Sequence, residues 1–309
     1  MRGACEHQLG RVLRVGLAAA LSVIGCHSRS ANRTPVEIWK QFSGQKALTH
    51  VQRQVDLGPR PPGSEAIAKT RQYIDSQLQA CGWRVLRQQF VDNTPRGAVQ
   101  FVNLIARFGP ATPSFLLCSH YDTKTFDNVR FVGADDGGSS TGLLLELARV
   151  LATQPELASK IELVFFDGEE AYEQFSAHDG LYGSRHFADD LAAQGIVRQF
   201  RGGMLFDMVG DRSLDITLPV DSQAAMARDL FASADALGLR KYFTYLSGSG
   251  GITDDHTPLN AIGIPTLDVI DFDYAWWHTP ADTTDKLSAE SLQIVGSVAL
   301  YYLVNFALK

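Results

Sequence analysis

Four short runs of mostly apolar residues, separated by segments with helical periodicity, constrain the fold of this chain more than any other feature. The runs have the length of strands rather than helices, and they cover residues 115–118, 161–166, 203–206 and 264–270. Such runs are typical of strands buried on both faces of a mostly parallel sheet. Between them lie helical patterns, such as the apolar face formed by residues 143–151. Alternating strands and helices predict an α/β fold, a three-layer sandwich in which helices flank a mixed, mostly parallel sheet.

Weaker signals predict the remaining elements. A helix is expected over residues 36–57, ended by the Gly- and Pro-rich segment 58–63. Ser64 can cap a second helix that runs to about Ala80, with Gly82 just after it. Two strands that pair with each other and two further helices are predicted over residues 83–91, 99–108, 222–237 and 288–307.

The composition excludes several classes of protein. The chain has 309 residues, with 28 Lys and Arg against 34 Asp and Glu, a formal net charge of −6. It has no basic block, so we expect no nucleic-acid partner. Its four cysteines are too few for a disulfide-built fold, and no apolar run reaches the roughly 18 residues of a spanning helix. Residues 36–309 contain no linker or repeat, which predicts one domain, and we expect a monomer.

The N-terminus is typical of an export signal. Arginines at positions 2, 11 and 14 precede an apolar or small segment, 15–25, of the size of a signal core. It ends in residues 23–26 (VIGC), which resemble a lipobox. We therefore expect a signal peptide over residues 1–26, lipidation of Cys26, and a polar tether over 27–35. The protein would then be exported, either periplasmic or membrane-anchored, and would contact a membrane only through that lipid. A plain secretory signal is the alternative.

Two cysteines remain in the mature chain, Cys81 and Cys118. An exported protein could pair them in a disulfide, and two buried thiols are an equal alternative. The sequence leaves this choice open.

Metal-ligand types of residue follow each apolar run at once. The first run leads into His120 and Asp122, the second into residues 167–170 (DGEE), and the third into Asp207. His278 follows the last run, and Asp136 starts a predicted helix. Because the carboxyl ends of parallel strands meet at one edge of the sheet, we expect these side chains to converge there. Clustered carboxylates repel unless a positive charge lies among them. Carboxylates mixed with imidazoles favour zinc.

The adjacent acids Glu169 and Glu170 are expected to have different roles. Neighbouring side chains diverge, so both cannot easily bind one ion. One of them can bind the metal while the other exchanges a proton with the reacting group.

Seven short motifs carry a resemblance to a known family. The chain resembles the zinc-dependent M28 peptidase superfamily and, within it, the animal-type glutaminyl cyclases, over nearly all of residues 36–309. This implies a zinc-dependent acyltransferase domain that converts the N-terminal glutamine of peptides or proteins to pyroglutamate and releases ammonia. The motifs are 58–64 (GPRPPGS), 120–124 (HYDTK), 131–136 (FVGADD), 165–171 (FFDGEEA), 181–186 (LYGSRH), 254–256 (DDH) and 277–279 (WHT).

The resemblance implies roles for individual residues. One zinc ion per chain would be bound by Asp136, Glu170 and His278, and Glu169 would move protons. Asp207 and Asp254 match two acids that form a hydrogen-bond network with Glu169. The residues implied at the substrate pocket are Trp277, Phe175, His256 and Lys124.

Several positions depart from the animal pattern. Phe175 stands where those enzymes carry a pocket tryptophan, and Asp273 stands near a pocket phenylalanine. Ser119 and Thr141 occupy the positions of the disulfide of the animal secreted enzymes, so that disulfide is expected to be absent.

The number of metals and the reaction have alternatives. In the two-zinc aminopeptidases of the same superfamily, the equivalents of His120 and Asp207 bind a second metal, bridged by the equivalent of Asp136. A two-zinc aminopeptidase is therefore the alternative function. An Asp207–Asp254 pair that shares a proton, and the nearby Lys124, favour one metal. A non-catalytic peptide-binding lipoprotein is disfavoured because the implied metal ligands and Glu169 are all present.

Overall fold

The computed structural model describes residues 37–246 and 251–309. The predicted signal peptide, Cys26 and the tether lie outside the described residues, as does most of the glycine-rich segment 247–251. The described residues belong to one unit, Glu37–Lys309. Among them no helix combines the length and the apolar character needed to cross a membrane.

The centre of the fold is an eight-stranded sheet with the spatial order β1-β2-β4-β3-β5-β8-β6-β7. The four apolar runs form its central strands: β3 (Phe115–His120), β4 (Ile161–Phe166), β5 (Gly202–Asp207) and β8 (Thr266–Ile270). β4 and β5 run parallel to β3 on its two sides, and β8 runs parallel to β5. The predicted parallel centre is therefore confirmed, and its strands all end at the same edge.

Antiparallel strands complete the sheet at both sides. β1 (Arg84–Thr94) and β2 (Gly97–Arg107) form a hairpin, as predicted, and β2 pairs with β4. On the other side, β6 (Ile216–Leu218) pairs antiparallel with β8, and β7 (Phe243–Tyr245) is parallel to β6. The sequence did not predict β6 and β7, because three residues are too few to show a strand period.

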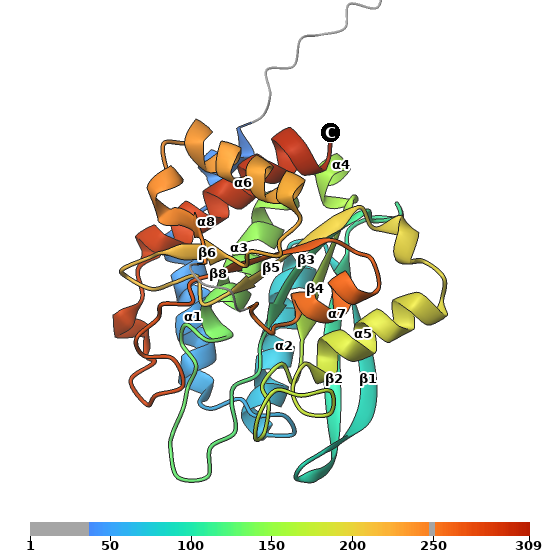
Figure 1. Ribbon diagram of the computed structural model, residues 1–309, viewed down its shortest axis with the longest axis vertical. Helices are drawn as coiled ribbons and strands as arrows, with labels where there is room; N and C mark the ends of the chain where they lie inside the picture. The colour runs from blue at the N-terminus through green and yellow to red at the C-terminus, as the bar shows by residue number, and fades with distance from the viewer. Residues whose placement is uncertain (1–36, 247–250) are drawn as a thin grey trace, which may run out of the picture. The chain divides into compact units, whose positions relative to one another are not determined.

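Helices cover both faces of the sheet and make the predicted sandwich (Figure 1). Alternate residues of β5 show the two cores: Met204 and Phe206 belong to the larger core, and Leu205 belongs to the smaller one. The helices of the larger core are α1 (Gly44–Leu57), α2 (Glu65–Ala80), α3 (Gly138–Leu151), α4 (Pro155–Ala158), α6 (Ala224–Ala236) and α8 (Ala289–Tyr302). The smaller core lies under α5 (Tyr182–Ala193) and α7 (His256–Ala261).

Two predicted helices differ from the structure. The single helix expected over 36–57 is a 3-10 turn, Ile38–Gln41, followed by α1. Phe42 and Ser43 are extended between them, and the Ser43 hydroxyl accepts a hydrogen bond from the Lys46 backbone N–H, so Ser43 starts a new helix. The helix expected over 288–307 is α8, continued by a π-helical turn, Leu303–Ala307. Ser64 caps α2 as predicted.

The two cysteines of the described chain are free thiols, so the disulfide alternative is wrong for this structure. Cys118 is buried in the smaller core, and Cys81 is half-buried beside the larger one. Ser119 and Thr141 lie next to each other, with their hydroxyl oxygens 3.1 Å apart. A hydrogen bond therefore stands where the resemblance places a disulfide in the animal enzymes.

Candidate functional site

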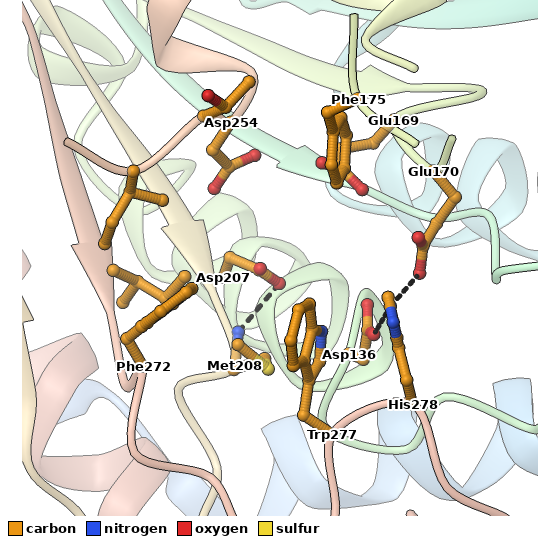
Figure 2. A pocket seen from close by; sticks show the side chains of 13 residues that line it. Asp136, Glu169, Glu170, Phe175, Asp207, Met208, Asp254, Phe272, Trp277 and His278 are labelled. Carbon is orange, nitrogen blue, oxygen red and sulfur yellow. Dashed lines mark hydrogen bonds and ion pairs between the residues drawn. The ribbon is translucent and has the colours of Figure 1, made fainter. Parts of the chain in front are cut away.

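Three predicted ligands meet at the edge of the sheet where the parallel strands end. One ligand atom from each of Asp136, Glu170 and His278 lies within 4.8 Å of the others. His278 Nε2 is 3.4 Å from Asp136 Oδ2 and 3.2 Å from Glu170 Oε1 (Figure 2). Donors about 2.1 Å from a tetrahedral zinc ion lie about 3.4 Å from each other, so this spacing fits one ion. We call these three residues the outer donor set.

Buried acceptors without a partner support the fit to a metal. Asp136 Oδ2 and Glu170 Oε2 are buried and have no hydrogen-bond partner. A buried carboxylate oxygen without a donor is costly, and such orphaned atoms are rare in native structures. Two carboxylates and one imidazole, with buried acceptors that have no hydrogen-bond partner, form a donor set that suits zinc.

Two other carboxylates hold the backbone that carries the donors. Asp122 accepts hydrogen bonds from the backbone N–H groups of Glu169 and Glu170, at 3.1 and 3.3 Å. Asp282 does the same for Asp135 and Asp136, at 2.8 and 3.2 Å. Each clamp fixes the direction in which the following side chains leave the chain. This explains why residues from distant segments meet with little freedom.

The backbone at His278 is itself strained. Its φ is 55°, in the left-handed region that a non-glycine residue rarely adopts. The imidazole stacks on the Trp277 ring at 4.2 Å between centroids and meets the edge of Phe131 at 5.9 Å. Such strain persists only where the surroundings determine the conformation, and it is common at functional sites.

Electrostatics in the outer donor set favour a bound cation. Burial alone lowers the pKa of His278, but hydrogen bonds to Asp136 and Glu170 raise it to about 9. Burial also raises the pKa of Glu170, and the charge of Asp136 adds to this. Lys124 lies beside this set, with Nζ 3.5 Å from Glu170 Oε2, and donates to the Ala171 carbonyl at 2.6 Å.

Glu169 is buried next to the outer donor set without belonging to it. It lines the same pocket as Asp207 and Asp254, and Figure 2 shows those two acids across the pocket from Glu170. Burial raises the pKa of Glu169 well above the usual carboxyl range; His120 opposes this, and the neighbouring acids Glu170 and Asp254 add to it. The divergence expected of the adjacent glutamates is present, because Glu170 faces His278 and Glu169 does not.

A second group of possible ligands lies behind Asp136. His120 Nε2 is 3.1 Å from Asp207 Oδ1 and 3.4 Å from Asp136 Oδ1, so the two oxygens of Asp136 face different imidazoles. Asp207 Oδ1 also accepts the Met208 backbone N–H at 2.8 Å. Gly137 makes this packing feasible, because a Cβ there would come within 2.8 Å of the His120 ring. The second metal position of the two-zinc enzymes is thus geometrically intact.

The pocket walls include predicted and unpredicted side chains. Phe175 and Trp277 line it, and Trp277 is 43% exposed, so its ring is free to contact a substrate. Phe272, which was not predicted at the site, lies 5.9 Å from Trp277 between ring centroids, and Asp273 is its neighbour in the chain. The apolar pocket residues Met208, Ile252 and Ile270 were not predicted either.

Two residues implied at the substrate pocket are not among the described residues that line it. Lys124 faces Glu170 and Ala171, as given above. His256 is the first residue of α7 and is buried, with Nδ1 3.4 Å from Asp268 Oδ2. The GPRPPGS motif has a structural explanation: the buried Arg60 guanidinium donates to the carbonyls of Tyr121, Val132 and Gly133, and so joins the loops after β3.

Comparisons with known proteins agree on one family. The model of peptidase family M28 matches residues 103–303. A glutaminyl-peptide cyclotransferase of Drosophila melanogaster is 30% identical, over 85% of this chain and 83% of its own length. A glutaminyl cyclase structure from an Acidobacteriales bacterium is 34% identical, covers 88% of this chain and 96% of that one, and has a TM-score of 0.80. A Zn-dependent exopeptidase from Parabacteroides distasonis is 27% identical, with a TM-score of 0.78, and covers 85% and 98% of the two chains.

Proposed function

The chain belongs to peptidase family M28, in its glutaminyl cyclase branch, and we propose how its site performs that reaction. The substrate is a peptide or protein that begins with glutamine. Its α-amine attacks the side-chain carboxamide carbon, a C–N bond forms, the C–NH₂ bond breaks, and ammonia leaves with pyroglutamate as the product. The observation that carries the proposal is one buried carboxyl, Glu169, beside the outer donor set in an aromatic pocket.

One zinc ion held by Asp136, Glu170 and His278 is the cofactor of the proposal. When bound, zinc supplies a Lewis acid toward the oxygen of the reacting amide. The chain's contribution is to hold three donors on clamped backbone, with a side open to the pocket that Trp277 lines.

Glu169 is the proton carrier of the proposal. Its carboxylate accepts a proton from the attacking amine and returns it to the departing nitrogen, so that ammonia rather than an amide anion leaves. A raised pKa suits this role, because it makes the carboxylate of Glu169 a stronger proton acceptor than an ordinary glutamate. Asp207 and Asp254, which line the pocket with it, hold Glu169 in place.

The aromatic side chains of the pocket explain how the substrate glutamine is held in a bent conformation. The reaction is intramolecular, so much of the barrier is removed when the side chain is held against its own amine. Phe175, Phe272 and Trp277 leave a narrow apolar space in which a glutamine side chain can bend back. The same narrowness disfavours cleavage of a peptide bond further along the chain.

One metal is proposed rather than two because His120 Nε2 and Asp207 Oδ1 already lie at hydrogen-bond distance from each other, 3.1 Å. Asp207 Oδ1 also accepts from the Met208 backbone N–H. The specific observation that favours the two-zinc aminopeptidase is the intact spacing of His120, Asp136 and Asp207. Its activity would release free amino acids, which the cyclase does not.

One assay decides between these two functions. The purified protein is incubated with a Gln-initiated peptide and, separately, with a Leu-initiated peptide, and products are read by mass spectrometry. The proposal predicts a product lighter by one ammonia from the first peptide and no change in the second. Free leucine from the second peptide would establish the aminopeptidase instead.

We also propose that the protein is exported and anchored through a lipid on Cys26. The positively charged start, the apolar segment and the VIGC motif support this. Cys26→Ala is expected to move the protein from the membrane fraction to the soluble fraction. Unchanged membrane retention of the variant would contradict lipidation at this residue.

A further inference from the structure

A further cluster, of two acids and one histidine, lies behind the pocket, outside the outer donor set. It consists of Asp254, His256 and Asp268, each of which offers a ligand atom within 4.8 Å of the others. All three are buried, and Asp268 has no exposed surface. We call these residues the inner cluster. Asp254 links it to the pocket, because Asp254 also lines the pocket wall.

The face of β8 explains why Asp268 points into this cluster. Its neighbours Leu267 and Val269 belong to the larger core, so the alternation of a strand sends Asp268 to the opposite face. That face is covered by α7, which packs against β8 and carries His256. Burial of a carboxyl here costs folding free energy, since the side chains of the adjacent smaller core are apolar.

The polar atoms of the inner cluster lack partners. Both carboxylate oxygens of Asp268, Asp254 Oδ2 and His256 Nδ1 are buried without a hydrogen bond. Asp254 Oδ1, by contrast, accepts the Asp255 backbone N–H at 2.6 Å. Among the described residues, neither Asp254 nor Asp268 has an ion pair with a Lys or Arg; the imidazole of His256 lies 3.4 Å from Asp268 Oδ2. Asp254 and Asp268 thus carry buried acceptors without a donor and approach within 4.8 Å of each other, an arrangement that something shared between the two acids would stabilise.

We propose that Asp268 is a positioning residue for the cyclisation: it shares a proton with Asp254 Oδ2 and thereby fixes the carboxyl that faces Glu169. This rests on the proposed function and deepens it. One proton converts two orphaned oxygens into an O–H···O bond, which satisfies both acids without a cation. The other oxygen of Asp268 then faces His256 Nδ1, which completes the inner cluster.

The charge balance agrees with this arrangement. Burial raises the pKa values of Asp254 and Asp268 well above the usual carboxyl range; the charge of Asp268 adds to the shift of Asp254, and the charges of Asp207 and Asp255 add to that of Asp268. Burial lowers the pKa of His256 to about 4, so its imidazole is neutral and does not supply the positive charge. A proton is therefore the available neutralising charge in this part of the described chain.

The consequence for catalysis is selective. Asp254 reaches the pocket, whereas Asp268 does not line it. Loss of the shared proton would leave Asp254 free to turn or to ionise, which disturbs Glu169 and the proton transfer. The aromatic walls and the outer donor set would stay in place, so substrate binding and zinc content would not change.

Two substitutions separate this role from a packing role. Asp268→Asn keeps the shape, and its amide N–H donates permanently to Asp254. Asp268→Val has similar bulk and suits a strand, but it leaves Asp254 without a partner; Asp268→Ala takes its place if the Val variant does not fold. The control is Glu162→Gln, another buried acid of the same sheet, which pairs with Arg107 away from the pocket.

The measurement is kcat and KM for a Gln-initiated peptide, with zinc content and thermal unfolding for each variant. We expect kcat of Asp268→Val to fall by about tenfold or more at unchanged KM. For Asp268→Asn we expect a kcat within about threefold of wild type. Zinc content should equal that of wild type in both, and the control should keep wild-type kinetics.

Three results would overturn the inference. They are a wild-type kcat in Asp268→Val, an equal loss of kcat in the Asn and Val variants, or a matching loss of metal in both, which would mean that a cation holds the cluster. Failure of the proposed function looks different, because the wild-type protein would then form no pyroglutamate at all.

Discussion

The outer donor set and the inner cluster each contain two carboxylates from Asp or Glu and one imidazole, but their surroundings in the structure differ. The imidazole of His278 is 21% exposed and that of His256 is 5% exposed. The pKa of His278 is raised to about 9, whereas that of His256 is lowered to about 4. Residue type alone therefore does not decide what a cluster does.

Position in the sheet accounts for the difference. The outer donor set lies where parallel strands end, where loops bring Asp136, Glu170 and His278 together and Asp122 and Asp282 clamp the backbone. The inner cluster lies between β8 and α7 on the side of the smaller core, is buried, and reaches the pocket only through Asp254. The first arrangement presents donors to a pocket, and the second stores a proton.

The largest expected effect comes from substituting the imidazole of each cluster and comparing the zinc content of the two variants. His278→Ala removes one of three ligands, so zinc content should fall to background and cyclisation by about 1000-fold or more. His256→Gln is the matched control and should retain its zinc. Metal analysis by mass spectrometry, with the peptide assay, measures both. Equal zinc loss in the two variants would mean that the two clusters do not differ as described.

The next effect concerns Glu169, which lies between the two clusters. Glu169→Gln keeps the size and hydrogen bonding of the side chain but cannot carry a proton, so kcat should fall by about 100-fold or more with zinc retained. Glu173→Gln, at an exposed position nearby, should keep wild-type kcat. Activity retained in Glu169→Gln would remove this residue from the proposed mechanism.

A third experiment measures how the buried His256 makes the stability of the protein depend on pH. The pKa of His256 is lowered to about 4 in the folded chain from 6.5, so between these values the unfolded chain binds more protons. Its contribution to stability is complete above pH 6.5 and is lost as the pH falls toward 4. From pH 7 to pH 5 this amounts to about 2 kcal/mol.

His256→Gln isolates that contribution from other titrating groups. The free energy of unfolding, measured in denaturant at both pH values, should fall more steeply for wild type than for the variant. Parallel pH dependence of the two proteins would show that His256 titrates normally.

The smallest expected effect concerns the pocket wall. Trp277→Ala removes an aromatic surface but no ligand, so KM should rise about tenfold while the unfolding temperature stays close to wild type. Trp276→Ala is the control, because that ring is also exposed and lies against Lys286 rather than in the pocket. An unchanged KM in Trp277→Ala would place this side chain outside the substrate site.

The sequence predicted the central parallel strands and the site residues that directly follow them. Apolar runs fixed the parallel centre, and the residues after them identified the positions of Asp136, Glu170 and His278. Short strands such as β6 were not predicted, because three residues are too few to show the alternation of a strand. Ser43 interrupts the helix predicted over 36–57, because its capping hydrogen bond outweighs the helical pattern around it.

Other parts of the site depend on contacts that sequence does not display. Asp122 and Asp282 act through backbone N–H groups of distant residues, which no spacing reveals. Phe272 contacts the pocket only because of how the loop after β8 turns. Asp268 was not predicted as a site residue because it lies inside an otherwise apolar run, and its role depends on which face of β8 it occupies.

The most direct test of the account is a crystal of the zinc-loaded protein, with anomalous diffraction recorded at the zinc absorption edge. The account predicts one peak, bounded by Asp136, Glu170 and His278 and open toward Trp277. A second peak between His120 and Asp207, or one within the inner cluster, would contradict it, as would no peak at the outer donor set.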